Sequence, residues 1–338
     1  MKTNTLRQLL LLLLLTSCTL PVASSTPTAP QATAATLTPT AYLPLVTRAP
    51  GGPQLGGCAL FPADNAWNLD ISAYPVHPNS AAYIASIGTD GHLHADFGAG
   101  LWEGFPIGIP YVIVPADQPL VPITFVEYGD ESDPGPYPVP LDAPVEGNPQ
   151  GDGDRHVLVL QQGECRLYEL YHAVQVGAGW EAGSGATFDL GSNALRPVCW
   201  TSADAAGLPI LPGLARYDEV AAGEIAHALR FTIARTQRGY IHPATHWASS
   251  ATDPALPPMG LRLRLRADFD LSDYTGQARV ILEALKRYGM IIADNGSNWF
   301  ISGAPDERWD NDDLRQLRTV PGSAFEAVYT GEIHTSCP

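Results

Sequence analysis

The chain of 338 residues is short of charge, and above all of positive charge. Only 16% of its residues are charged, and 19 Lys and Arg stand against 35 Asp and Glu, which gives a formal net charge of −16. A nucleic-acid binder normally carries a basic field. We therefore expect no nucleic-acid partner.

Several motifs that identify a reaction are also absent. The sequence contains no P-loop, no Rossmann glycine fingerprint, no Gly-x-Ser-x-Gly elbow and no HExxH pair. It has no Cys-x-x-Cys pair, so the usual zinc-ribbon and thioredoxin motifs are excluded as well. Any reaction must be inferred from less specific patterns of carboxylates, histidines and aromatic residues.

The composition predicts a folded, β-rich protein. Hydrophobic residues make up 45% of the chain, which is enough to bury a sizeable core and excludes global disorder. The 32 glycines and 31 prolines argue against a helical bundle and favour many short strands joined by turns. We expect a mainly β fold with two or three helices, arranged as a single-domain β-sandwich or jelly roll.

The N-terminus predicts export. Seven consecutive leucines, Leu9 to Leu15, follow a charged start and are too few to span a bilayer as a mature helix. The following Thr-Ser-Cys, which ends at Cys18, resembles the lipobox of bacterial lipoproteins, in which the cysteine is acylated and becomes the new N-terminus. We expect residues 1–17 to be a signal peptide and Cys18 to be the lipidation site. An ordinary signal peptide with an incidental cysteine is the alternative.

The segment after this cysteine predicts a tether rather than a core. Residues 18–50 are rich in Thr, Pro and Ala and almost free of charge, so they cannot build a packed domain. We expect a lipid-anchored linker here, a single β-rich domain over 58–329 and a tail over 330–338. The protein would then lie at the cell surface or in the periplasm, and a lipid anchor would be its contact with the membrane.

The remaining cysteines are even in number, as expected of an exported chain. They are Cys58, Cys165, Cys199 and Cys337. An oxidising compartment favours two disulfides between them. The three pairings that four cysteines allow stay open.

Residues 154–173 predict a hairpin around the turn signal Gln162-Gly163. A two-residue turn places His156 opposite Glu169 on the apolar face of the two strands. An imidazole that faces a carboxylate can form an acid/base pair, although a structural cross-strand ion pair is an equal alternative. We predict that Glu169 is one catalytic carboxylate and that His156 orients it.

Residues 218–232 predict a helix that begins at Asp218. At 100° per residue, Glu224 falls inside the apolar arc and His227 lies at its edge. Burial would make Glu224 hold its proton more tightly, as the general acid of a glycosidase does. We predict Glu224 as the second catalytic carboxylate, tuned by His227. A purely structural Glu224 is the alternative.

Two further regular segments follow. Residues 261–266 alternate leucine and arginine, which predicts a strand with leucines inward and arginines outward. Arg262 and Arg264 could then grip an anionic glycan, although neutralisation of neighbouring carboxylates is the plainer interpretation. Residues 275–288 predict an amphipathic helix, followed by a strand over 290–293 and a tight turn to a returning strand at 299–301.

Other candidate residues lie outside these elements. Trp200 could stack on a sugar, and His242 and His246 are candidate substrate-binding residues. The His-x₃-His spacing of that pair is typical of a zinc site on a helix, but Pro243 opposes a helix there, so we predict no metal ligands.

A long acidic segment, residues 129–154, is predicted to form a loop. Its carboxylates are Asp130, Glu131, Asp133, Asp142, Glu146, Asp152 and Asp154. We expect no cofactor. Calcium, which favours clustered carboxylates, is the alternative here, although the spacing does not match an EF-hand.

Three segments of the chain resemble a family of exported bacterial proteins of unknown activity. They are residues 154–171, with DRHVLVL and CRLYELY, residues 201–232, with TSADAAGLPILPGLARYDEV, and residues 281–299, ILEALKRYGMIIADNGSNW. The resemblance covers most of 58–328. It implies export and one shared domain, but no activity and no site residues.

The function that these patterns favour is that of a surface-anchored, glycoside hydrolase-like enzyme on an extracellular polysaccharide or glycan. It would use the carboxylates Glu169 and Glu224 as an acid/base pair. The fold-level part of this argument is analogy only. A non-catalytic glycan-binding or envelope protein, with Trp180, Trp200 and Trp247 as contacts, is one alternative. A polysaccharide lyase is another.

Overall fold

The structure is a computed structural model that describes residues 52–337. The expected signal peptide, Cys18 and the linker over 18–50 lie outside the described residues. Seventeen strands and four α-helices confirm that the described part is β-rich, while the particular type of sandwich stays a prediction. None of the helices within this part has the length and apolarity that are needed to cross a membrane.

The largest sheet has six strands of mixed direction. Across the sheet they are β17 (Phe325–Val328), β14 (Arg262–Leu265), β15 (Met290–Asn295), β13 (Leu229–Ile233), β16 (Phe300–Ser302) and β3 (His94–Asp96). The pairs β13–β15 and β16–β3 are parallel and the others antiparallel. This order brings four separate parts of the chain together at β15, β13, β16 and β3.

Helix α3 (Gly276–Arg287) packs against β14 of this sheet, and α1 (Ser80–Ile87) packs against β17. The buried side of α3 repeats at the spacing of one helix face, because Ala278, Ile281, Leu282 and Leu285 are all buried. The helix expected over 275–288 is thus confirmed, and so is the strand that follows it.

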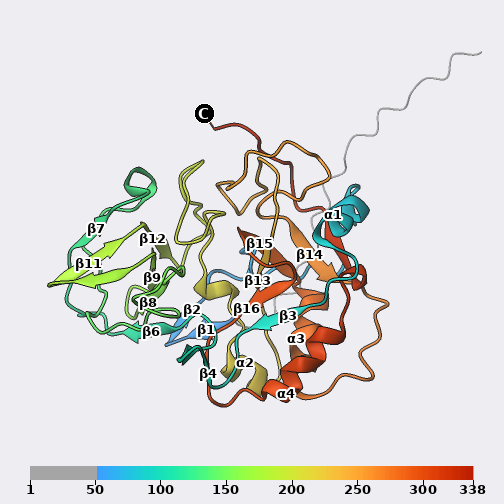
Figure 1. Ribbon diagram of the computed structural model, residues 1–338, viewed down its shortest axis with the longest axis horizontal. Coiled ribbons are helices and arrows are strands. Elements are labelled where there is room, and N and C mark those ends of the chain that lie inside the picture. Colours follow the sequence, from blue (N-terminus) through green and yellow to red (C-terminus); the bar gives the residue numbers. More distant parts are fainter. Residues whose placement is uncertain (1–51, 338) are drawn as a thin grey trace, which may run out of the picture. The chain divides into compact units, whose positions relative to one another are not determined.

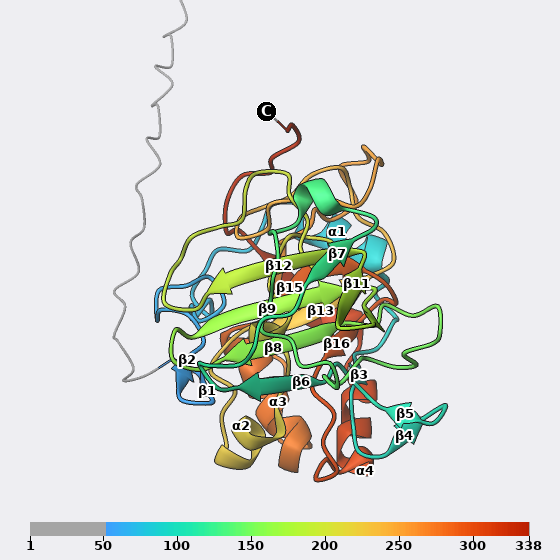
Figure 2. The same ribbon diagram turned by 90° about the vertical axis from the view of Figure 1, so that its left-hand side faces the viewer.

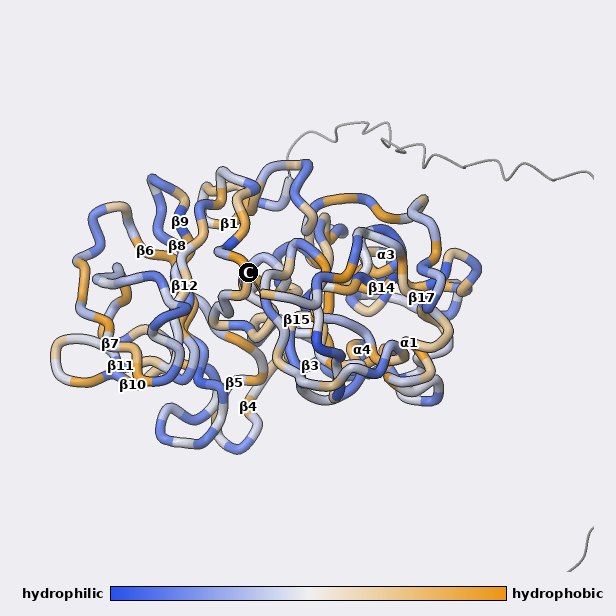
Figure 3. The backbone as a smooth tube through the Cα atoms, turned by 90° about the horizontal axis from the view of Figure 1, so that it is seen from above, coloured by the Kyte–Doolittle hydropathy of each residue, from blue (hydrophilic) through white to orange (hydrophobic). Residues whose placement is uncertain are grey.

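Two smaller sheets complete the main layers. One has four strands, β12 (Ser184–Asp189), β9 (Arg166–Tyr171), β8 (Val157–Gln161) and β6 (Tyr111–Val114); the other has three, β10 (Val174–Val176), β11 (Gly179–Ala182) and β7 (Ile123–Phe125). Figure 1 and Figure 2 show the four-stranded sheet between the other two. Viewed from above, β7, β10 and β11 lie at one end of the described part, and β14 and β17 lie at the other (Figure 3).

Each face of the four-stranded sheet is apolar, so the sheet separates two hydrophobic cores. Leu158, Leu160 and Leu167 belong to the main core with the six-stranded sheet. Val157, Val159 and Leu170 belong to a smaller core with the three-stranded sheet. This alternation follows from the period of two along a strand.

Short elements lie at the margins of these layers. They are the hairpins β1 (Gln54–Leu55) with β2 (Cys58–Ala59) and β4 (Leu101–Trp102) with β5 (Phe105–Pro106), the helices α2 (Tyr217–Ala222) and α4 (Asn311–Leu314), and the 3₁₀-helices η1 (Gly129–Glu131), η2 (Leu211–Gly213), η3 (Arg315–Thr319) and η4 (Gly322–Ala324).

Two disulfides link distant parts of the chain. Cys58 pairs with Cys165 and Cys199 pairs with Cys337, across sequence separations of 107 and 138 residues. The two bridges indicate an oxidising, exported environment. The second ties the C-terminal segment to the domain, where the backbone of His334 also exchanges two hydrogen bonds with Tyr240.

The expected hairpin forms as β8 and β9, but its register differs by two residues. Leu158 lies opposite Glu169, and residues 162–165 make a longer turn. His156 is therefore not opposite Glu169, and its ring lies beside Tyr171 with the ring centroids 5.9 Å apart. Because the shift is even, His156 and Glu169 still point to the same face.

The helix expected over 218–232 is wrong in its second half. Helix α2 ends at Gly223, whose φ of 91° is in the left-handed region that glycine adopts without strain, and whose amide bonds back to the carbonyls of Glu219 and Val220. The chain then enters the sheet as β13. An apolar run this short fits a buried strand as well as a helix. Here residues 229–233 form a strand because they pair with β15 and β16.

Candidate functional site

A buried arginine on β13 organises the polar centre of the domain. Nε and Nη2 of Arg230 donate to the two carboxylate oxygens of Asp204, each at 2.8 Å, and Nη1 donates to Oγ of Ser302 at 2.8 Å. Oδ2 of Asp294 lies 3.4 Å from Nη2. Burial alone would lower the pKa of Arg230, but the charge and hydrogen bonds of Asp204 raise it. The guanidinium is therefore a fixed positive charge.

The sheet register extends this centre towards the surface. Phe231 pairs with Ile301, so Arg230 lies opposite Ser302, and Ser302 pairs with Asp96 of β3. Arg230, Ser302 and Asp96 thus occupy one row across three adjacent strands. The row leads from a buried cation to a carboxylate that solvent reaches.

The segment of residues 200–216 lies between the six-stranded and four-stranded sheets. Asp204 connects it to β13 on one side. On the other side, the amides of Ile210 and Leu211 donate to the carboxylate of Glu169 on β9 at 2.9–3.0 Å. Glu169 has no exposed surface, and burial raises its pKa to about 7 against these hydrogen bonds. Glu169 therefore has a structural role, because its carboxylate holds residues 210–211 against β9.

His156 and Glu146 form a second charged pair beside the arginine. Nδ1 of His156 lies 2.5 Å from Oε2 of Glu146, and its Nε2 lies 3.0 Å from the carbonyl oxygen of Ala203. Both partners accept hydrogen bonds, so both ring nitrogens carry hydrogen and the ring is an imidazolium. Burial alone would lower the pKa of His156, but the charge and hydrogen bond of Glu146 raise it to about 9.

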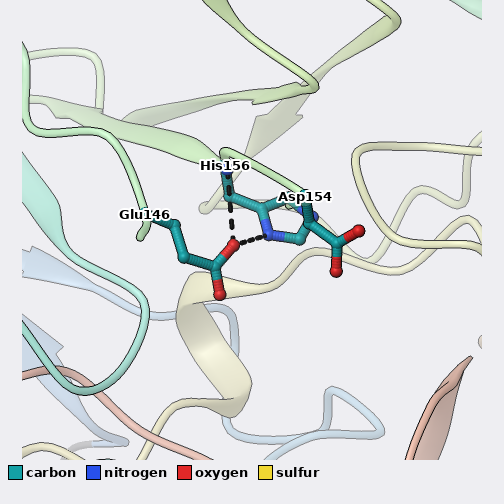
Figure 4. A group of neighbouring side chains, drawn as sticks. All are labelled: Glu146, Asp154 and His156. Carbon is teal, nitrogen blue, oxygen red and sulfur yellow. Dashed lines mark hydrogen bonds and ion pairs between the residues drawn. The ribbon is translucent and has the colours of Figure 1, made fainter. Parts of the chain in front are cut away.

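The same pair keeps Glu146 ionised. Burial alone would raise the pKa of Glu146, but the charge and hydrogen bonds of His156 and the charge of Arg230 lower it below its ordinary value. Asp154 lies on the other side of His156, and one donor atom each of Glu146, Asp154 and His156 fall within 4.8 Å of one another (Figure 4).

This trio does not fit a histidine-ligated metal site. A metal needs a free lone pair on the imidazole, and both nitrogens of His156 already donate to oxygen acceptors. Glu146 and Asp154 alone remain as oxygen ligands. Calcium therefore stays the alternative to the expectation of no cofactor, and no contact of the described residues supports it further.

A cavity of about 880 Å³ opens beside these groups. Asp96 and Glu146 both line it, with walls from the end of β3, from β5 and the residues after it, and from α4 and η3. The β4–β5 hairpin stands beside β3 and α4 in Figure 2 and contributes Trp102, whose side chain is 72% exposed. An exposed indole at the edge of a cavity is a surface on which a sugar ring can stack.

The carboxyl groups around the cavity differ in how tightly they hold a proton. The surrounding protein partly desolvates Asp96, and together with the charge of Glu146 this raises the pKa of Asp96 despite Arg230. Burial and the charge of Asp204 raise the pKa of Asp294 to about 7. Glu146 moves in the opposite direction. One cavity therefore contains a carboxyl group whose pKa is raised and another whose pKa is lowered.

The structure does not bring the two predicted catalytic carboxylates together. Glu169 is enclosed between the sheets, whereas Glu224 follows α2 at the surface, where its side chain is 58% exposed and bonds to Arg287 at 2.8 Å. The expected burial of Glu224 in an apolar helical arc is wrong, because α2 ends before it. The structure agrees with the alternative of a structural Glu224, which forms an ion pair with Arg287.

His227 is buried, but it serves another ion-pair network. Its Nε2 lies 2.9 Å from Nη2 of Arg216 and 3.2 Å from Oε2 of Glu219. Burial alone would raise the pKa of Glu219, but the charges of Arg216 and His227 lower it to about 2. His227 therefore does not tune Glu224.

The strand with alternating arginines forms as β14, and its leucines are buried as expected, but the arginines do not face outward. Arg262 is 3% exposed and Arg264 is 8% exposed. Their guanidinium groups donate to backbone carbonyls of residues 66–74 and, for Arg264, to Glu326. The N-terminal part of the domain covers this face, so the predicted anion-binding stripe is wrong.

The remaining predicted contacts lie away from the cavity lining. Trp200 is half-buried beneath the guanidinium of Arg196, 5.8 Å from its ring centroid. His246 bonds to the carbonyl of Ala205 at 2.7 Å, and the exposed His242 lies beside His334 with ring centroids 4.5 Å apart.

Sequence reasoning missed most of the residues of the cavity and of the buried polar centre. Asp96 and Trp102 line the cavity, whereas Asp204, Arg230 and Asp294 belong to the buried centre. Signals existed for two of them: Asp96 ends an extended Gly-His-Leu-His-Ala-Asp segment, and Asp294 ends an apolar strand before Asn-Gly. Glu146 was visible only as one of seven carboxylates in the acidic segment.

Comparison of the chain with protein-family models, with curated proteins and with solved structures finds no match. The function is therefore argued from the site itself.

Proposed function

We propose that the protein is a hydrolase of an extracellular glycan, with Asp96 as general acid and Glu146 as general base. One observation carries the proposal: two carboxyl groups line the same cavity, and their environments move their pKa values in opposite directions. Such a difference assigns acid and base roles in many hydrolases.

The reaction assigned to this pair is the addition of water across a glycosidic bond. Asp96 gives its proton to the glycosidic oxygen as the carbon–oxygen bond breaks. Glu146 takes a proton from the water that attacks the sugar carbon. The charges of Glu146 and Arg230 act on Asp96, and Trp102 provides a stacking surface for a sugar ring.

A non-catalytic glycan-binding protein is the second candidate, and the exposed Trp102 favours it as well. A polysaccharide lyase has little support, because Arg262 and Arg264, the arginines that could bind an acidic polysaccharide, are buried. A screen of polysaccharides with product analysis separates the three. New reducing ends without unsaturation mean hydrolysis, unsaturated ends mean a lyase, and retention without turnover means a binding protein.

The roles of the pair are tested on whichever glycan is turned over. Asp96→Asn removes the proton that the acid donates, and Glu146→Gln removes the carboxylate that accepts a proton, while both keep the side-chain shapes. Each variant should therefore lose about 10²–10⁴-fold in kcat/KM. The matched control is Glu224→Gln, which changes an exposed carboxylate outside the cavity and should retain full activity. If Asp96→Asn and Glu146→Gln stay active, the acid/base assignment is wrong.

We further propose that acylated Cys18 holds the enzyme at the membrane, because the residues before Cys18 resemble a lipobox. A diacylated cysteine carries two lipid chains, which are enough for stable anchoring. The native protein should fractionate with membranes, and Cys18→Ala should release it. A wild-type protein that is wholly soluble and begins at another residue contradicts the anchor, but leaves the site proposal intact.

A further inference from the structure

One wall of the cavity carries two arginines. Arg315 and Arg318 of η3 both line the cavity, and both are exposed. Arg315 is paired with Asp312, a neighbour in the chain. Within the part of the chain that the structure describes, the guanidinium of Arg318 has neither a carboxylate nor a hydrogen-bond acceptor.

Most of the described arginines donate to a carboxylate or a carbonyl oxygen, as expected where acidic residues are in large excess. Among the described residues, three other arginines also lack an acceptor for their guanidinium groups: Arg166, Arg235 and Arg238. None of these three lines the cavity. Arg318 is therefore the one free guanidinium of the described residues that faces this space.

Strand β3 links the arginine-bearing wall of the cavity to the proposed hydrolytic pair. His94 and Asp96 are two residues apart on β3, so they share a face and are separated by about 7 Å. His94 stacks on Phe300 with ring centroids 4.0 Å apart, and the nearby positive charge of Arg318, after burial, contributes to lowering the pKa of His94. A lowered pKa favours the neutral form of His94. The positive charge in this part of the cavity then comes from Arg318.

We propose that the cavity binds an anionic glycan, one with a carboxylate or sulfate group on a sugar next to the bond that is cleaved, and that Arg318 binds this anionic group while Trp102 stacks on a ring. The proposal rests on the proposed glycan activity of the same cavity. Arginine suits the task because its planar fork matches carboxylate and sulfate oxygens.

The net charge of the protein gives Arg318 a specific role. A chain of formal charge −16 repels an anionic polymer at long range, but a Debye length of about 8 Å at physiological ionic strength screens most of that repulsion. A local cation inside the cavity can then decide whether the anionic sugar is accepted.

Binding is measured with the full chain carrying Glu146→Gln, which slows turnover enough for binding to be measured. Three probes of equal length are compared: a neutral oligosaccharide, a uronate oligosaccharide and a sulfated oligosaccharide. We expect at least one acidic probe to bind more tightly than the neutral one. Arg318→Ala should weaken that binding roughly tenfold or more and leave neutral binding unchanged, and Arg318→Lys should restore part of it.

Arg235→Ala is the matched control, because Arg235 is an exposed arginine without an acceptor outside the cavity. Equal binding of neutral and acidic probes, or an Arg318→Ala variant that binds as its parent does, overturns the anionic-glycan proposal. Hydrolysis of a neutral glycan by the wild type would then leave the proposed function standing. Acidic binding that depends on Arg318 but lacks turnover supports the subsite and contradicts the hydrolase. No binding by any probe contradicts both.

Discussion

Glu146 and His156 form an ion pair in which only the carboxylate reaches the cavity. His156 is 1% exposed and donates from both ring nitrogens, whereas Glu146 lines the cavity together with Asp96. The histidine is therefore a positioning residue. It fixes the direction of Glu146 and keeps it ionised without touching a substrate.

The first prediction concerns His156→Gln, which keeps a hydrogen-bond donor but removes the charge. Loss of this close positive charge should raise the pKa of Glu146. The acid limb of the pH dependence of kcat/KM, which reports the ionisation of Glu146, should therefore move to higher pH. His172→Gln is the control, since His172 pairs with Glu127 outside the cavity lining. An unmoved acid limb contradicts the positioning role.

The second prediction concerns stability and pH. The folded-state pKa of His156 is raised to about 9, so its contribution to stability is complete below its ordinary pKa and is lost as the pH rises through about 9. The pKa of Glu146 is lowered, so its contribution is complete above its ordinary pKa and is lost as the pH falls through the lowered value. Urea midpoints of wild type and His156→Gln should therefore differ most between pH 4.5 and 6.5, the ordinary pKa values of the two groups, and should converge above about pH 9. A constant difference would argue against the ion pair.

The third prediction concerns the buried arginine. Asp204→Asn removes the carboxylate that binds Arg230 through two hydrogen bonds and leaves the guanidinium largely uncompensated between the sheets. Breaking a buried pair on one side costs about 3–5 kcal/mol, so the urea midpoint should fall clearly. Asp268→Asn breaks the exposed pair with Arg266 and should leave the midpoint unchanged. Equal midpoints for Asp204→Asn and wild type would show that the pair is not important for stability.

The parts of the fold that the sequence predicted are those that local patterns determine. The spacing of apolar residues in α3 and the alternation in β14 survive in any packing, because they reflect one helix face and two strand faces. The tight turn expected at Asn295-Gly296 does not form, because Asn295 still belongs to β15 and residues 296–299 make the connection to β16. The returning strand pairs with β13 rather than with β15. Sheet order depends on long-range packing, and no local pattern encodes it.

The site was poorly predicted for the same reason. Arg230, Ser302 and Asp96 meet in one row because β13, β16 and β3 are neighbours, although more than 130 residues separate Asp96 from Arg230 along the chain. The error at Glu224 had a local cause, since Gly223 ends the helix and exposes the carboxylate that helical periodicity placed in the core. For Arg262 and Arg264, alternation gave the right strand but could not reveal that a second layer covers its polar face.

The fourth prediction concerns the disulfides. Four cysteines allow three pairings, and the structure selects Cys58–Cys165 and Cys199–Cys337. Peptide mapping of the unreduced protein should recover these two linked pairs and no free thiol among the four. Removing the second bridge with Cys199→Ser and Cys337→Ser should lower the free energy of unfolding by about 2–5 kcal/mol, because the bridge closes a long loop.

Unfolding of the Cys199→Ser, Cys337→Ser variant should begin in the C-terminal segment. Without the bridge, the backbone pairing of His334 with Tyr240 still joins this segment to the domain. Limited proteolysis of the double variant should therefore cut first after residue 329, while the cavity retains its activity. Removal of Cys58 and Cys165 instead frees the start of the domain from β9, the strand that carries Glu169. That variant should lose activity together with stability. If both double variants lose activity equally, the C-terminal segment contributes to the site in a way that the cavity lining does not include.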